Sequence, residues 1–88
     1  MASYRVVLKP SVEKDLRSLP KSVTVRVWDR LEALANNPHP RHSVKLAGAE
    51  RLYRIRVGDY RAVYDVDDEA KLVTVHYVRH RREAYRNL

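Results

Sequence analysis

The sequence predicts an α+β fold with the element order β-α-α-β-β-β. We expect a four-stranded, mainly antiparallel sheet with a helical hairpin packed on one face. Three observations predict this class. Apolar residues recur at helical spacing in the first half of the chain, and they alternate with polar residues at strand spacing in the second half. A stretch rich in Asn and Pro separates the two halves. The length of 88 residues predicts a single domain over residues 1–88, with a small core.

The first two elements follow from short local signals. Tyr4–Leu8 is rich in apolar and β-branched residues, which predicts a strand. Pro10 at a first helical position, or Ser11 as an N-cap, then opens a helix. The apolar positions of this helix, at helical spacing, are Val12, Leu16 and Leu19. Pro20 ends this helix or begins the next.

A second amphipathic helix is predicted from Lys21 to about Asn36. Its apolar stripe consists of Val23, Val27, Leu31, Leu34 and Ala35. We expect Val25 and Trp28 to widen this stripe, and Trp28 and Tyr64 to lie in the core. The run Asn36–Pro40 stops the helix and opens a loop, so the two helices should form a hairpin.

The second half predicts three strands in a meander, over Leu52–Val57, Tyr60–Val66 and Lys71–Val78. Gly58-Asp59 is suited to a two-residue hairpin turn with positive φ. The third strand is apolar on both sides, which favours a place inside the sheet. His76 within it is interpreted as a half-buried structural histidine.

The charge balance points to an anionic partner. Eighteen Lys and Arg against eleven Asp and Glu give a net charge of +7. A basic surface of this size favours a phosphate-bearing ligand, and an acidic protein would satisfy it equally. A solvated basic surface with no partner is the remaining alternative.

Several classes of function are excluded or left without support. There is no cysteine, so the chain has no disulfide and no zinc–thiolate site. The four histidines lack the spacing of a helical metal site, and no Gly-rich phosphate loop is present. We therefore expect no metal or other cofactor. No apolar run approaches the ~20 residues of a membrane span, so we expect a cytoplasmic protein with no membrane partner.

With metal, thiolate and phosphate-loop sites set aside, arginines are the main candidates for a functional site. Alternation places Arg54 and Arg56 on the sheet face opposite Ile55, and Arg61 begins the next strand on the corresponding face. We expect these three guanidinium groups to converge. Like charges paired across strands cost stability, which favours a use for them. The alternative is that they are ordinary solvated residues of a one-sided sheet.

A second basic cluster closes the chain at residues 79–82, close to Tyr85. A tyrosine beside arginines can stack on a base while the arginines hold phosphates. The alternative is a charged tail that the tyrosine anchors to the core.

Two segments of the sequence resemble the RelE/ParE toxin superfamily. The run Leu52–Tyr64 looks like its central hairpin signature, and Val78–Tyr85 looks like its closing segment. The opening strand Tyr4–Leu8, the pair Leu19-Pro20 and the stop at Asn36–Pro38 also fit. The resemblance covers essentially the whole chain and implies the fold predicted above.

The resemblance to the RelE branch implies a ribosome-dependent toxin. Such toxins enter the 30S A site and cut mRNA without a metal: the 2′-hydroxyl attacks the neighbouring phosphate and leaves a 2′,3′-cyclic phosphate. A cognate RelB-like antitoxin would neutralise this toxin, and the pair would reach operator DNA only as a complex. Two alternatives stay open. One is a ParE-like, non-nucleolytic inhibitor of DNA gyrase, and the other is a module whose basic face only docks an acidic antitoxin helix.

The resemblance also assigns candidate residues. The catalytic candidates are Arg54, Arg56, Arg61, His80, Arg81 and Tyr85. The RNA-binding candidates are Lys45, Arg51, Arg79, Arg82 and Arg86. Arg54 and Arg56 stand where RelE-type toxins often have lysines. Because arginine does not readily give up a proton, these residues are anion clamps rather than bases, and His80 becomes the candidate proton carrier.

Overall fold

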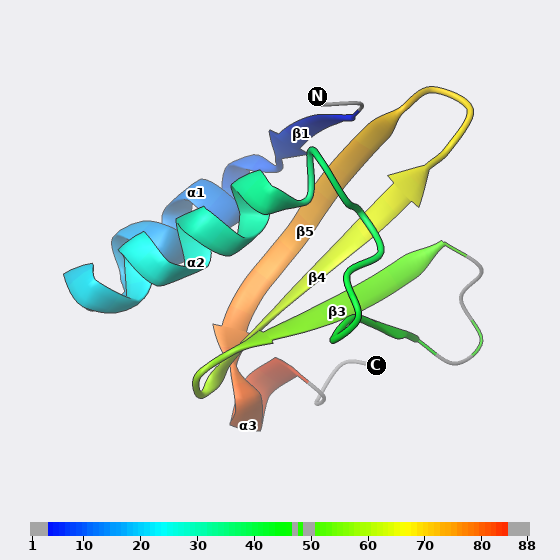
Figure 1. Cartoon of the computed structure of the whole chain (residues 1–88). Helices are drawn as coiled ribbons and strands as arrows, with labels where there is room; N and C mark the ends of the chain where they lie inside the picture. Colours follow the sequence, from blue (N-terminus) through cyan, green and yellow to red (C-terminus); the bar gives the residue numbers. More distant parts are fainter. Residues whose placement is uncertain (1–3, 47, 49–50, 85–88) are drawn as a thin grey trace.

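The helices and strands follow the predicted order. In this computed structural model, which describes residues 4–46, 48 and 51–84, the first half forms β1 (Arg5–Leu8), α1 (Pro10–Arg17) and α2 (Lys21–Ala33) (Figure 1). The second half forms β2 (Val44–Lys45), β3 (Leu52–Val57), β4 (Tyr60–Asp67), β5 (Leu72–His80) and α3 (Arg81–Ala84). No helix in these ranges is both long and apolar enough to span a membrane.

The sheet confirms the α+β class but has one strand more than predicted. Its order is β1-β5-β4-β3-β2, with β1 parallel to β5 and the other neighbours antiparallel. The additional strand is β2, in which Val44 pairs with Arg54 and Lys45 with Tyr53. A two-residue strand is too short to show alternation, so it becomes visible only where its partner strand is present.

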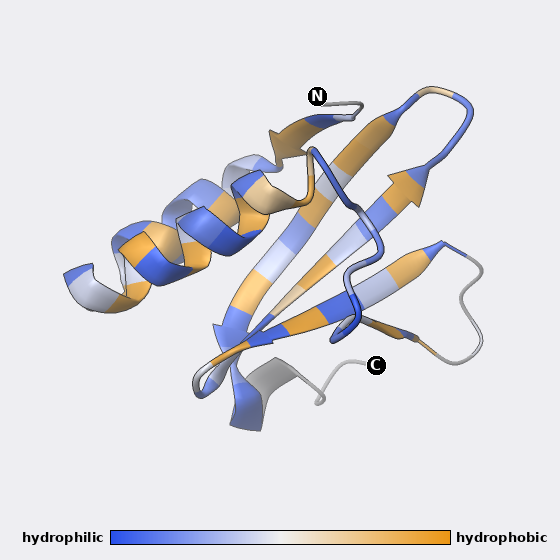
Figure 2. Cartoon of the chain, in the orientation of Figure 1, coloured by the Kyte–Doolittle hydropathy of each residue, from blue (hydrophilic) through white to orange (hydrophobic). Residues whose placement is uncertain are grey.

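The helical hairpin covers one face of the sheet (Figure 1). It buries Val12 and Leu16 from α1 and Val27 and Leu31 from α2. Figure 2 shows hydrophobic residues alternating with hydrophilic ones along β3 and β4, as a sheet with one covered face requires. Helix α2 ends at Ala33, short of the predicted Asn36. Over residues 34–36 the backbone N–H groups bond three residues back, so the chain tightens into turns before Pro38.

The prediction that Trp28 and Val25 belong to the buried stripe is wrong. Trp28 is 43% exposed and Val25 is 58% exposed. Only one side of α2 is buried. At helical spacing Val25 lies well outside the row through Val27 and Leu31, and Trp28 lies at the border of that row. Trp28 instead lines a shallow groove beside Val6 of the edge strand β1.

Tyr64 lies at the centre of the core, as predicted. Its side chain is fully buried, and its hydroxyl donates a 2.9 Å hydrogen bond to the backbone oxygen of Pro38. Its ring stacks on Tyr53 at 5.9 Å between centroids. The bond ties the loop after α2 to the middle of β4, and burial raises the pKa of Tyr64 to about 12.

Two backbone features set which side chains share a face. Gly58 has φ of +60° at the first position of the two-residue turn between Val57 and Tyr60, which confirms the predicted hairpin. A bulge interrupts the β4–β5 register, because Val63 pairs with Tyr77 whereas Tyr64 pairs with Val75. His76 is therefore an extra residue in β5. It is half-buried, and its buried Nε2 has no hydrogen-bond partner among the described residues.

The hydroxyl of Tyr64 should make a measurable contribution to stability. We expect Tyr64→Phe to lower the free energy of unfolding by about 1–2 kcal/mol, because a buried carbonyl loses its donor. Above pH 10 the wild-type protein should lose about 1 kcal/mol by pH 11, since the folded state holds the phenol proton more tightly than the unfolded state does. Urea unfolding at both pH values measures these differences. Tyr53→Phe is the control, and equal pH dependence in Tyr64→Phe and wild type would contradict the assignment.

Candidate nucleic-acid interface

Three arginines stand in one line across the uncovered sheet face, next to the β3–β4 turn. In the β3–β4 register Arg56 pairs with Arg61, and in the β4–β5 register Arg61 pairs with Arg79. We call Arg56, Arg61 and Arg79 the arginine row. The row faces away from the helices, because the neighbouring register positions Ile55 and Ala62 are buried in the core. Like charges opposite one another on adjacent strands destabilise a sheet, so the row costs the fold free energy.

The turn beside the row holds two of its members in place. The backbone oxygen of Gly58 accepts hydrogen bonds from Arg56 Nε at 3.1 Å and from Arg61 Nη1 at 3.3 Å. Arg61 Nη1 also donates to the backbone oxygen of Tyr60 at 3.1 Å. A carbonyl oxygen orients a guanidinium group without cancelling its charge. The turn therefore directs these two side chains.

The third member of the row is held by an aromatic ring. The guanidinium carbon of Arg79 lies 4.7 Å from the centroid of Tyr77, which is two residues earlier in β5. This is cation–π distance, and it also leaves the charge uncancelled. Both residues lie on the same face, because the bulge at His76 precedes them and strand alternation is regular from there on.

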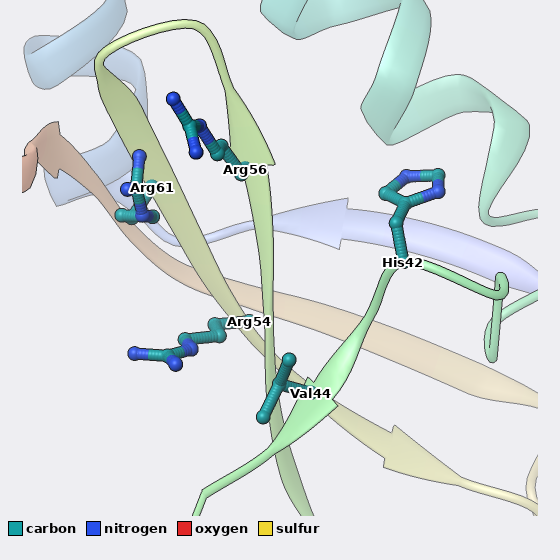
Figure 3. Close-up of a pocket in the computed structure, with 5 residues that line it drawn as sticks. All are labelled: His42, Val44, Arg54, Arg56 and Arg61. Atoms are coloured by element: carbon teal, nitrogen blue, oxygen red, sulfur yellow. The ribbon is translucent and has the colours of Figure 1, made fainter.

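A pocket of about 240 Å³ adjoins the row. It is lined by His42, Val44, Arg54, Arg56 and Arg61 (Figure 3). The structure thus brings together the three arginines that alternation predicts to converge. Three cations around one small cavity suit a phosphate group, which arginine can contact through two parallel N–H groups.

Two of the predicted RNA-binding residues do not join the row. Arg51 pairs through Nη2 with Asp65 at 2.9 Å and with Asp67 at 3.3 Å, and the hydrogen bond to Asp65 raises the pKa of Arg51. Lys45 pairs in register with Tyr53, whose ring stacks on the core residue Tyr64. Because alternate residues point to opposite faces, Lys45 is directed away from the arginine face.

The short helix of the closing segment begins beside the β3–β4 turn. The backbone N–H of Arg81, the first residue of α3, donates to the backbone oxygen of Asp59 at 2.7 Å. Arg81 and Arg82 are exposed. They therefore add positive charge at the same end of β4 as Arg61. The remaining predicted residues of this segment, Tyr85 and Arg86, lie outside the described residues.

His80 occupies the other face of the sheet. It pairs in register with Tyr60, and its ring meets that of Tyr60 edge-on at 5.5 Å between centroids. Its Nδ1 accepts a hydrogen bond from the backbone N–H of Arg82 at 3.3 Å. Since its neighbour Arg79 belongs to the arginine row, alternation directs His80 away from the row. The predicted proton carrier is thus not among the residues that the structure gathers around the pocket.

Acidic residues gather at the opposite end of β4. The turn that follows β4 carries Asp68, which accepts a 2.6 Å hydrogen bond from the hydroxyl of Tyr4. This bond lowers the pKa of Asp68 and raises that of Tyr4. Eight residues of extended chain separate the two ends of β4 by about 25 Å. The protein therefore has a basic end and an acidic end, which orients an approaching polyanion.

Sequence reasoning missed two features of this interface. Arg79 was predicted only as a general RNA contact, because the bulge that aligns it with Arg61 has no strong local signal. His42 was not selected at all. It lies in an irregular loop, and only the pairing of β2 with β3 brings that loop to the pocket.

Solved structures of known toxins share this fold. The RelE–RelB complex of Pyrococcus horikoshii contains a chain that superposes with a TM-score of 0.82 and 36% identity, covering 93% of this chain and 99% of that one. The isolated RelE toxin of Escherichia coli gives a TM-score of 0.77 and 28% identity, covering 88% of this chain and 83% of that one. The fold is thus that of a RelE-like toxin.

Sequence comparisons identify the family. Residues 6–85 match the model of the ParE toxin of type II toxin–antitoxin systems. The toxin RelE of Mycobacterium tuberculosis is 31% identical over 84 residues, which are 94% of this chain and 87% of that protein. The chain therefore belongs to the RelE/ParE superfamily of type II toxin–antitoxin toxins, which confirms the resemblance seen in its hairpin and closing segment.

Repulsion within the arginine row should appear in the salt dependence of stability. Salt screens the repulsion between like charges. Raising the salt concentration from about 0.05 M to about 0.5 M should therefore stabilise the wild-type protein. We expect Arg61→Gln to reduce this increment by about 0.5 kcal/mol, because the central cation of the row is gone. Urea unfolding at the two salt concentrations provides the measurement. Arg17→Gln, on the exposed side of α1, removes the same charge elsewhere, and equal increments in the two variants would contradict the effect of the row.

Proposed function

We propose that this protein is the toxin of a type II toxin–antitoxin system and acts in the cytoplasm as a ribosome-dependent endoribonuclease. It enters the 30S A site, cuts the mRNA there without a metal and so stops translation. The arginine row is the observation that carries this proposal. Cations aligned on an uncovered sheet face at a cost to stability are matched to the phosphates of an RNA strand.

The proposed reaction is attack by a 2′-oxygen on the adjacent phosphorus. The bond from phosphorus to the 5′-oxygen breaks, which leaves a 2′,3′-cyclic phosphate and a 5′-hydroxyl. The transition state carries more negative charge on the phosphoryl oxygens than the ground state. Arg56 and Arg61, oriented in advance by the Gly58 carbonyl, stabilise that charge, and Arg54 contacts it from the other side of the pocket.

The closing segment contributes to the same site. The backbone of Arg81 is bonded to the β3–β4 turn, so its guanidinium group can reach the RNA strand beyond the row. Tyr85 stacks on or positions a neighbouring base, a role implied by the family and by its place after the arginines. Arg79 and Arg82 hold flanking phosphates, as does Arg86.

The partner is a RelB-like antitoxin. RelE toxins of Pyrococcus horikoshii and Mycobacterium tuberculosis have been solved in complexes with antitoxins. A segment that neutralises this chain carries carboxylates opposite the arginine row, the closing segment or both. The complex, rather than the toxin alone, contacts operator DNA.

Cleavage on translating ribosomes tests the proposed activity. Primer extension should show cuts at codon-defined positions in mRNA bound to ribosomes, and none in the same RNA free in solution. We expect Arg61→Ala and Arg81→Ala to lower single-turnover cleavage about 100- to 1,000-fold, the usual loss for one electrostatic donor. Arg17→Ala should cleave like wild type. Inhibition of supercoiling by gyrase, without any mRNA cut, would support the ParE-like alternative instead.

Ribosome affinity should depend steeply on salt, because binding of the basic face releases cations from RNA. Arg56→Ala and Arg79→Ala should each reduce the slope of log affinity against log salt concentration by about 0.7–0.9. Co-sedimentation with ribosomes over a series of salt concentrations gives this slope. Lys14→Ala is the control for loss of one exposed charge. Unchanged slopes in the two arginine variants would remove the basic face from the proposal.

A further inference from the structure

The proposed cleavage needs a group that accepts the proton of the 2′-hydroxyl. Five residues line the pocket beside the arginine row. The side chains of four of them offer no lone pair on nitrogen or oxygen: Val44, Arg54, Arg56 and Arg61. Guanidinium nitrogens donate hydrogen bonds and accept none. The fifth lining residue is His42, and an imidazole ring nitrogen can accept a proton.

The placement of His42 suits this task. The residue precedes β2 and is exposed. Figure 3 shows its imidazole on the β2 side of the pocket, with the guanidinium groups of Arg54 and Arg61 on the β3 and β4 side. The lining of the pocket thus combines guanidinium groups from β3 and β4 with one imidazole from the loop before β2.

A hydrogen bond from α2 defines the state of the ring. Arg30 Nη1 lies 3.0 Å from His42 Nε2. Because a guanidinium group can only donate, Nε2 must be the acceptor in this bond. An Nε2 that accepts carries a lone pair, and in this contact the ring proton is on Nδ1. An imidazole nitrogen that carries a lone pair is the form that a general base requires.

We propose that His42 is the general base of the cleavage reaction and that Arg30 is its positioning residue. This inference rests on the proposed function. The substrate 2′-hydroxyl takes over from Arg30 as the donor to Nε2. Its proton then moves to Nε2, the 2′-oxygen bonds to phosphorus, and the bond from phosphorus to the 5′-oxygen breaks. The departing 5′-oxygen takes a proton from water.

The charged side chains that line the described part of the pocket are all cationic. Arg30 approaches from α2, Arg54 and Arg56 line the cavity from β3, and Arg61 lines it from β4. No carboxylate of the described residues lines this pocket to compete for the proton. The histidine that the closing segment supplies, His80, faces the other side of the sheet.

The test compares two loop histidines by single-turnover cleavage on mRNA-programmed ribosomes, between about pH 5 and pH 8. His42→Gln should lower the rate about 100- to 10,000-fold and remove the rise in rate with pH that the wild type shows. His39→Gln is the matched control, since His39 lies against Tyr53 and Asp68 and does not line this pocket; it should keep both the rate and the rise. A His42→Gln protein that retains the wild-type rate and pH profile overturns the assignment.

A second measurement tests the positioning role without relying on activity. In long-range ¹H–¹⁵N NMR spectra of the wild type, His42 should show its proton on Nδ1 at a pH where the ring is neutral. In Arg30→Met the proton should redistribute between the two ring nitrogens, and the cleavage rate should fall while His39→Gln stays normal. An identical tautomer in Arg30→Met and wild type would overturn the role of Arg30.

The two proposals fail in different ways. If the wild type cuts no mRNA on ribosomes, the proposed function falls and the role of His42 falls with it. If the wild type cuts normally and His42→Gln cuts equally well, only the assignment of the base is overturned.

Discussion

The two-residue turn at Gly58 and Asp59 is the constraint on which the whole interface depends. A positive φ at Gly58 closes the hairpin so that Arg56 stands directly opposite Arg61. The same turn then supplies the acceptors that orient the site. The Gly58 carbonyl holds both of those arginines, and the Asp59 carbonyl receives the N–H of Arg81 at the start of α3. A longer turn would change the register and remove these contacts together.

Space at this turn is restricted on the helix side as well. A β-carbon added to Gly58 would lie 3.2 Å from a guanidinium nitrogen of Arg26 on α2. The φ value and this close approach both favour glycine here.

The fold places its favourable and unfavourable interactions on different faces of one sheet. The helix-covered face buries the apolar residues and the Tyr64 hydroxyl bond, which stabilise the domain. The open face brings like charges together, which opposes that stability. Such a conflict between local electrostatics and folding is typical of a functional surface, because a ligand of opposite charge relieves it on binding. The acidic turn at the far end of β4 reinforces this polarity without neutralising the row.

Much of the fold was predictable from local patterns in the sequence. The spacing of Val12 and Leu16, the alternation around Ile55 and the Gly58-Asp59 pair are short-range signals, and each reports a helix, a strand or a turn directly. The same alternation predicted that Arg54, Arg56 and Arg61 share a face, and the hairpin brings them to one pocket. The family was likewise recognisable from contiguous residues.

Other features depend on contacts between distant segments, and only the tertiary structure decided them. The exposure of Trp28 depends on which side of α2 meets the sheet. The extra residue at His76 aligns Arg79 with Arg61, and strand alternation then turns His80 to the opposite face. The pairing of β2 with β3 brings His42 to the arginines. The sequence by itself determined the elements and the chemistry that each could present. The pairing of distant strands decided which of these groups meet, because register and packing are set by long-range contacts that no local pattern encodes.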